Sequence, residues 1–340
     1  MTQQVRVERL VASARRLRGV VGGGSVRLGL QVYRAAAPSE SLPGPAPPPV
    51  VFVRGLGMTM NDSHHFASLL ALSPSRRGSA VVTFDHLGFG ESSVPEPHWG
   101  DGSIRGMALD ALDVADCASA ALGASCFDLV GVSMGGYIAM SAALERQRQL
   151  EGGETGACYR ELDDGAHRFA RALVVGCSHH GGPSMEPITS PYVARLRELE
   201  LHEPRTEGWR RAVRELYALN FSPAFVRASP RFPGLLRAFE ESCLCDTRAG
   251  LAYQNTAVER FYREGMREEL AELRLATLIL TGDVDSIVPA RNSLLLKERL
   301  PHARLDMLRG VGHMFFEEAP ERTVDLVSAW LLRHATPAFV

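Results

Sequence analysis

The stretch FDLVGVSMGGYIAM, residues 127–140, places a single serine, Ser133, between Gly131 and Gly135. An apolar run typical of a buried strand precedes this serine, and a run with helical spacing follows it. Glycine at both flanking positions removes side chains that would collide in a tight strand-to-helix turn. Two interpretations compete. The turn contains a serine by chance, or it holds a nucleophile in a strained backbone with its hydroxyl exposed.

The composition of the chain is that of a globular protein. Its 340 residues are 45% hydrophobic, which allows a large α/β domain with an insertion. The net charge of −2 lacks the basic character of a nucleic-acid-binding protein, so we expect no nucleic-acid partner. No apolar run has the length needed to cross a bilayer, so we expect no transmembrane segment.

The six cysteines and the first residues bear on metal binding and localisation. Cys243 and Cys245 have no second pair at zinc-finger spacing, so we expect no metal site. The first 20 residues are polar and arginine-rich, without the apolar core of a secretory signal. We therefore expect reduced thiols and a cytoplasmic location, with a mitochondrial presequence as the alternative.

Short, continuously apolar segments alternate with helix-like segments along most of the chain. This alternation predicts a mostly parallel sheet flanked by helices, because such strands are buried on both faces. Strands are expected at residues 25–36, 50–54, 80–84, 126–131, 170–177, 276–282 and 303–310. Helices are expected at residues 104–122, 134–146, 290–300 and 320–334.

Changes in composition divide the chain into a core and additions. Residues 25–180 and 271–340 are predicted to form the α/β core, and residues 1–24 an N-terminal extension. Within the core, residues 147–169 are polar and read as a surface insertion. Residues 181–270 show several helical patterns and hold 10 of the 24 aromatic residues. We predict that this segment is a helical cap over the carboxyl edge of the sheet.

A serine hydroxyl needs a general base, and the base needs an acid that orients it. His313 is the preferred base, because it follows a glycine-containing loop and precedes the final helix in RGVGHMFFEEAPE, residues 309–321. Asp285 is the preferred acid in LTGDVDSIVP, residues 280–289, while Asp283 is better suited to ordering the turn. Five other histidines at strand ends are alternative pocket residues: His64, His65, His86, His179 and His180.

Five motifs occur in an order that resembles the α/β-hydrolase superfamily, in its cap-bearing branch of esterases and lactonases. They are VVFVRGLG (50–57), FDHLGFGESS (84–93), GVSMGG (131–136), LTGDVDSIVP (280–289) and GVGHMFFEEAP (310–320). The resemblance covers residues 25–340 and implies Ser133 as nucleophile, Asp285 as acid and His313 as base. It also implies an oxyanion hole made by the backbone N–H groups of Leu56 and Met134.

Two features of the motifs concern loops rather than the reaction. Asp85, Gly88, Gly90 and Ser92 match a structural loop of the family. Arg54 stands where the family usually has a histidine before the first glycine. The expected oxyanion donor is a backbone N–H, so the chemistry should survive this departure, while the local hydrogen bonding is left open.

These observations predict a serine hydrolase without metal or organic cofactor. It would cleave a carboxylic ester, lactone or thioester of a small, partly apolar substrate through an acyl-enzyme on Ser133. A serine nucleophile argues against dehalogenases and epoxide hydrolases, which use aspartate, and Met134 disfavours a proline iminopeptidase, which usually has tryptophan there. The alternatives are a C–C bond hydrolase, a monoacylglycerol lipase, and a ligand receptor on the same fold with incidental hydrolysis.

Overall fold

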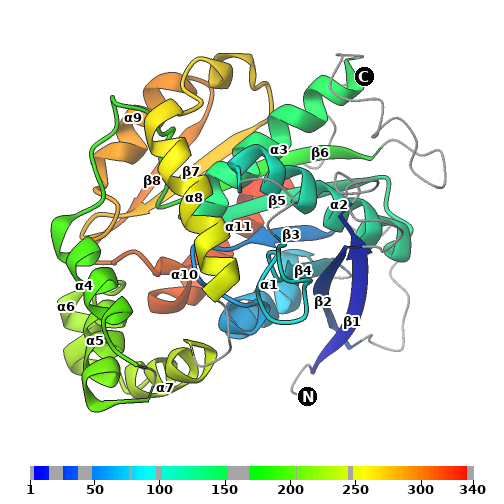
Figure 1. The fold of residues 1–340 in the computed structure, drawn as a ribbon. Coiled ribbons are helices and arrows are strands. Elements are labelled where there is room, and N and C mark those ends of the chain that lie inside the picture. The colour runs from blue at the N-terminus through cyan, green and yellow to red at the C-terminus, as the bar shows by residue number, and fades with distance from the viewer. Residues whose placement is uncertain are drawn as a thin grey trace.

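The fold is built on one eight-stranded sheet, shown in Figure 1. The computed structural model describes residues 4–14, 26–36, 48–76, 79–96, 102–151, 168–203, 205–243 and 248–334. The strand order is β1-β2-β4-β3-β5-β6-β7-β8, in which β1 and β2 are antiparallel to their neighbours and the remaining pairs are parallel. The strands are β1 (Val5–Ser13), β2 (Arg27–Ala35), β3 (Val50–Val53), β4 (Ala80–Phe84), β5 (Cys126–Val132), β6 (Phe169–Gly176), β7 (Thr277–Gly282) and β8 (Arg304–Leu308).

Helices cover both faces of the sheet, which explains why its central strands are buried almost throughout and largely apolar. Along β3, Val51 and Val53 point to one hydrophobic core and Val50 and Phe52 to the other, as the two-residue period of a strand requires. The first core is completed by α2 (Ile104–Leu122), α3 (Met134–Leu150) and α9 (Arg291–Arg299). The second is completed by α1 (His64–Leu72), α10 (Phe315–Glu318) and α11 (Pro320–Arg333).

In the described residues between β6 and β7, the segment expected to form a cap contains five α-helices. They are α4 (Ser190–Glu200), α5 (Glu207–Ala218), α6 (Pro223–Ala228), α7 (Phe232–Cys243) and α8 (Arg248–Glu264), and the described part of residues 181–270 contains no strand. Thr206 and Ser222 cap α5 and α6 by accepting hydrogen bonds from backbone N–H groups. Many of the segment's rings pack against each other: Tyr217 and Phe239, for example, stack with centroids 4.4 Å apart.

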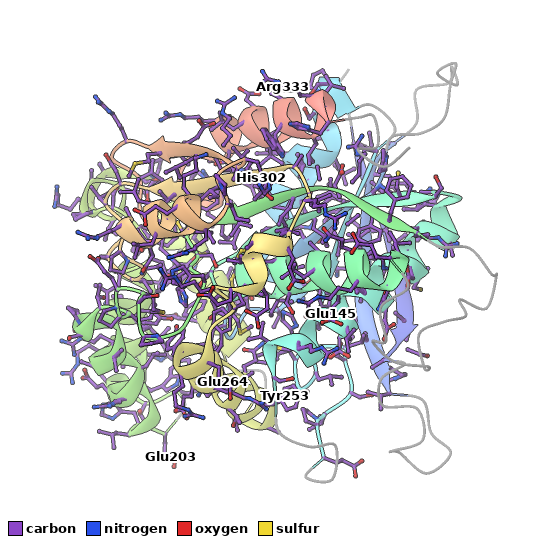
Figure 2. The ribbon with its side chains drawn as sticks, turned by 90° about the horizontal axis from the view of Figure 1, so that it is seen from above. Glu145, Glu203, Tyr253, Glu264, His302 and Arg333 are labelled. Carbon is purple, nitrogen blue, oxygen red and sulfur yellow. The ribbon has the colours of Figure 1, made fainter. Side chains whose placement is uncertain are left out.

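Helix α8 connects this segment to the core through very close backbone approaches. A Cβ atom at Gly88 would lie 2.3 Å from the Cα atom of Gly250, and one at Gly102 would lie 2.1 Å from the carbonyl oxygen of Tyr253, which Figure 2 labels on α8. Phe261 of the same helix stacks on Tyr137 of α3, with centroids 4.3 Å apart. Larger residues at these glycines would push α8 away from the core.

Two expected boundaries differ from the structure. Residues 1–24 were predicted to be an extension, but Val5–Ser13 pairs with β2 over its whole length. This strand lies at the sheet edge with Val7 and Val11 exposed, and its charged residues Arg6, Glu8 and Arg9 break the apolar pattern that the central strands have. Residues 147–150 belong to α3 rather than to a polar insertion, and β6 begins at Phe169, while residues 152–167 lie outside the described part.

Two other expectations fall partly or wholly outside the described residues. Residues 15–25, part of the possible presequence, are not described, nor are Cys245 and the side chain of Cys243. Among the described helices, none is both long and apolar enough to cross a membrane.

Candidate active site

Ser133 occupies the turn between β5 and α3 in a backbone conformation that few residues other than glycine adopt. Its φ is 57° and its ψ is −124°, a combination that costs about 1–3 kcal/mol and is concentrated at functional sites. Its N–H donates to the Gly176 carbonyl at 2.8 Å, which ties the turn to β6. The flanking glycines are required sterically: a Cβ at Gly131 would lie 2.1 Å from the Gly135 oxygen, and one at Gly135 would lie 2.1 Å from the Val53 oxygen.

The two backbone segments expected to supply oxyanion donors both adjoin this serine. Met134 is the first residue of α3, where backbone N–H groups have no partner within the helix. A Cβ at Gly55 would lie 3.2 Å from Ser133 Cβ and 3.6 Å from Ser133 Oγ, so the loop after β3 passes beside the hydroxyl. Leu56 follows in that loop and lines the same cavity as Ser133.

The structure joins Asp285 to His313, although they are 28 residues apart in the sequence. His313 Nδ1 donates to Asp285 Oδ2 at 2.7 Å, and both side chains are buried. The other carboxylate oxygen accepts from the N–H groups of Ile287 and Val288 at 2.8 and 3.0 Å, which fixes its orientation. This arrangement leaves His313 Nε2 as the ring nitrogen available to the cavity that His313 shares with Ser133.

The alternative candidates differ in whether they reach the cavity beside Ser133. Asp283 accepts a hydrogen bond from the Gly310 N–H at 2.6 Å and so orders the turn after β7. His86 and His179 are buried, and burial lowers the pKa of each to about 3, so both are neutral at physiological pH. His64 and His65 line the cavity that contains Ser133, as the sequence allowed.

Cys177 adjoins the Asp285–His313 pair. These three residues are the one group of possible metal ligands found among the described residues, with donor atoms within 4.8 Å of one another. Metal binding would require a thiolate, whereas burial and the Asp285 carboxylate raise the pKa of the Cys177 thiol well above its ordinary value. Since Asp285 also holds His313 Nδ1, the group is better suited to orienting an imidazole than to binding a cation.

A cavity of about 260 Å³ opens beside Ser133, and its walls differ in chemistry. The wall contributed by α5 and α7 is mostly apolar and comprises Leu216, Tyr217, Leu235, Ala238 and Phe239. The core contributes most of the polar lining, Asn61, Asp62, His64, His65 and Glu317, together with the apolar Leu56, Met58, Val132, Met314 and Phe316. The cavity therefore suits a molecule with one apolar part and one polar part.

Glu317 is one of the polar cavity residues, with Asn61 and Asp62, that no sequence motif singles out. Its side chain is 2% exposed, Oε1 has no hydrogen-bond partner among the described residues, and Oε2 lies 3.3 Å from Arg231 Nη2. Burial raises its pKa to about 7, against the opposing effect of Arg231. Its neighbour Glu318 instead accepts hydrogen bonds from Ser222 and Gly312, and nothing in the sequence separates the two adjacent glutamates.

Comparison with known proteins identifies the family. The model of the alpha/beta hydrolase family matches residues 50–326. The chain belongs to this family. The motif resemblance and the fold class expected from the sequence are thereby confirmed.

One curated relative and two solved structures are also similar to this chain. Polyketide synthase ThaQ of Burkholderia thailandensis is 27% identical over 316 residues, covering 91% of this chain, and the chain spans only 13% of that protein's length. An esterase of Thermogutta terrifontis has a TM-score of 0.66 at 20% identity, covering 97% of this chain and all of that one. A 2-hydroxy-6-oxo-6-phenylhexa-2,4-dienoate hydrolase of Rhodococcus sp. strain RHA1 has a TM-score of 0.67 at 20% identity, covering 96% of this chain and 99% of that one. At these identities, the structural likeness establishes the fold alone.

Proposed function

We propose that this alpha/beta hydrolase is a serine hydrolase that cleaves a carboxylic ester, lactone or thioester through an acyl-enzyme on Ser133. The observation that carries the proposal is the strained Ser133 turn, which opens into the same cavity as a histidine held by Asp285. A serine alone is a weak nucleophile at neutral pH, and an oriented imidazole is what activates it.

The positions of Ser133, Asp285 and His313 support the following reaction. His313 Nε2 takes the proton of Ser133 as Oγ attacks the substrate carbonyl, and Asp285 stabilises the imidazolium that forms. The N–H groups of Leu56 and Met134 stabilise the oxyanion. His313 then returns the proton to the leaving alcohol or thiol, and activates the water that hydrolyses the acyl-enzyme.

The walls of the cavity support a substrate that is partly apolar. Leu216, Tyr217 and Phe239 face the space beside Ser133 and would contact the apolar part of the substrate. We propose that the segment 181–270 acts as a cap in this sense, with its remaining rings holding the cap helices together.

A fluorophosphonate probe and short p-nitrophenyl esters test the proposal directly. The wild-type protein is expected to label at Ser133 and to hydrolyse the esters with multiple turnovers. Ser133→Ala should abolish labelling and lower kcat on the order of 10⁶-fold, as in related triads, with an unchanged melting temperature.

Each contrary outcome has a distinct meaning. Ester turnover that survives in Ser133→Ala would show that Ser133 is not the nucleophile. Labelling without ester turnover in the wild-type protein would instead favour a C–C bond hydrolase or a ligand receptor on the same fold.

A further inference from the structure

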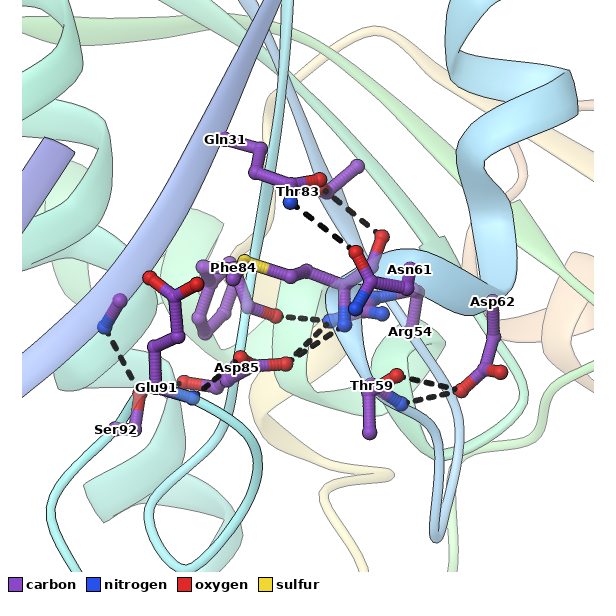
Figure 3. Close-up of polar contacts among 12 residues, drawn as sticks. Gln31, Arg54, Thr59, Asn61, Asp62, Thr83, Phe84, Asp85, Glu91 and Ser92 are labelled. Atoms are coloured by element: carbon purple, nitrogen blue, oxygen red, sulfur yellow. Dashed lines mark hydrogen bonds and ion pairs between the residues drawn. The ribbon is translucent and has the colours of Figure 1, made fainter. Parts of the chain in front are cut away.

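Arg54 lies immediately before Gly55, in the loop that carries the expected oxyanion donor Leu56. Its side chain is fully buried, although an arginine in the interior is costly unless its charge is compensated. Both of its partners lie at the end of the neighbouring strand β4. One guanidinium nitrogen, Nη2, donates to the Phe84 carbonyl and lies 3.7 Å from Asp85 Oδ1, as Figure 3 shows.

Asp85 connects this arginine to the far end of the same loop. Its Oδ1 accepts from the Met60 N–H at 2.7 Å, while Oδ2 accepts from the Glu91 N–H at 2.9 Å. The carboxylate thus contacts the loop of residues 54–60 at its beginning, through Arg54 (Figure 3), and at its end, through the Met60 N–H. A Cβ at Gly90 would lie 2.1 Å from Oδ2, so the loop after β4, residues 85–92, closes tightly around the Asp85 carboxylate.

Helix α8 holds the middle of the loop. The Gly57 N–H donates to Oε1 of Gln254, which is fully buried, at 2.9 Å. Gly57 has a φ of 73°, a left-handed conformation, so the chain turns sharply directly after Leu56. The three attachments bracket Leu56, whose own N–H is expected to face the cavity.

The buried arginine is not a favourable choice for stability alone. Its Nε and Nη1 have no hydrogen-bond partner among the described residues, and a buried donor left unpaired costs about 1–3 kcal/mol. Well-packed apolar residues often replace buried ion pairs without loss of stability. A role in holding the loop of residues 54–60 in place would account for a buried arginine at this position.

We infer that Arg54 is a positioning residue: acting through Asp85, it holds residues 54–60 so that the Leu56 N–H meets the oxygen of a carbonyl attacked by Ser133. The inference rests on the proposed hydrolase function and deepens it. Arg54 does not itself touch the substrate. A displacement of the loop would weaken the stabilisation of the oxyanion more than it weakens the binding of the uncharged ester.

The test compares Arg54→Met with Arg171→Met. Arg171 forms another buried ion pair, with Asp128, in which Nε and Oδ1 are 2.8 Å apart. That pair joins β6 to the first half of β5, and neither residue lines the cavity beside Ser133. For both variants, kcat and KM for a p-nitrophenyl ester and the melting temperature are measured at a temperature well below unfolding.

Arg54→Met is expected to lower kcat about 10- to 100-fold with KM changed less than threefold, since removing an oxyanion donor outright costs about 10²–10³ in kcat. Arg54→Lys should recover part of this loss, because an ammonium group keeps the charge near Asp85. Arg171→Met should lower the melting temperature while kcat stays within twofold of wild type.

An Arg54→Met protein with the kcat of Arg171→Met would overturn the inference. If Arg54→Met does not fold, Arg54→Lys and Arg171→Lys are compared instead. Arg54→Lys is then expected to lower kcat at least threefold, while Arg171→Lys stays within twofold of wild type. Equal kcat values for the two lysine variants would overturn the inference. Wild-type protein without any ester turnover would overturn the proposed function together with this inference. Wild-type turnover with an unaffected Arg54 variant would overturn the inference alone.

Discussion

Glu317→Gln should change how the stability of the protein depends on pH. In the folded protein, burial raises the pKa of this carboxyl to about 7, compared with an ordinary value of 4.5. A carboxyl with a raised pKa favours folding in its protonated form. The contribution of Glu317 to the free energy of unfolding is therefore fully present below about pH 4.5 and is lost as the pH rises to about 7.

The size of the effect follows from the two pKa values. They differ by about 2.5, and at about 1.4 kcal/mol per pKa unit the free energy of unfolding should fall by about 3 kcal/mol across this range. Glutamine has nearly the same shape and does not ionise. We therefore expect the variant to gain about 3 kcal/mol relative to wild type between pH 4.5 and pH 8.

Urea unfolding of both proteins at pH 4.5, 6 and 8, followed by the fluorescence of the three tryptophans, measures this difference. Arg231→Met is the matched control, because Arg231 lowers the pKa of Glu317. Its removal should raise that pKa further and steepen the loss of stability above pH 7. Parallel pH profiles for wild type and Glu317→Gln would refute the reasoning, as would a variant that loses stability relative to wild type between pH 4.5 and pH 8.

Two further predictions concern catalysis. Asp285→Asn should lower kcat on the order of 10⁴-fold, because an amide cannot stabilise the imidazolium on His313. Asp283→Asn should mainly lower the melting temperature. If ester assays showed the larger loss of kcat for Asp283→Asn, the acid role would pass to Asp283. In a series of p-nitrophenyl esters, kcat/KM should rise about fourfold per methylene from acetyl to medium-chain acyl groups, at about 0.8 kcal/mol each, until the cavity is full. Tyr217→Ala should flatten this rise, and a flat wild-type profile from acetate to octanoate would point to a small or polar substrate.

The sequence was sufficient for features that depend on local pattern. Largely apolar runs marked the central strands, because helices cover such strands on both faces. The glycines around Ser133 marked the turn, because only residues without a side chain fit between β5, β3 and α3. The positions of Asp283 and Asp285 after the end of β7 were likewise enough to favour Asp285 as the expected acid.

Other features depend on contacts between distant residues, and only the tertiary structure could decide them. The sequence showed that Arg54 departs from the family pattern, but its partner Phe84 lies 30 residues away and becomes one only when β3 and β4 pair. Glu317 contacts Arg231, which lies 86 residues away in the sequence. The raised pKa of Glu317 comes from burial, and a glutamate in a sequence does not show whether it is buried. Strand β1 carries the charged residues Arg6, Glu8 and Arg9, and its place in the sheet became evident only from its pairing with β2. Local pattern therefore specified the scaffold and the expected catalytic residues. The roles of the charged residues near them, Arg54 and Glu317, depend on burial, which is a property of the folded chain.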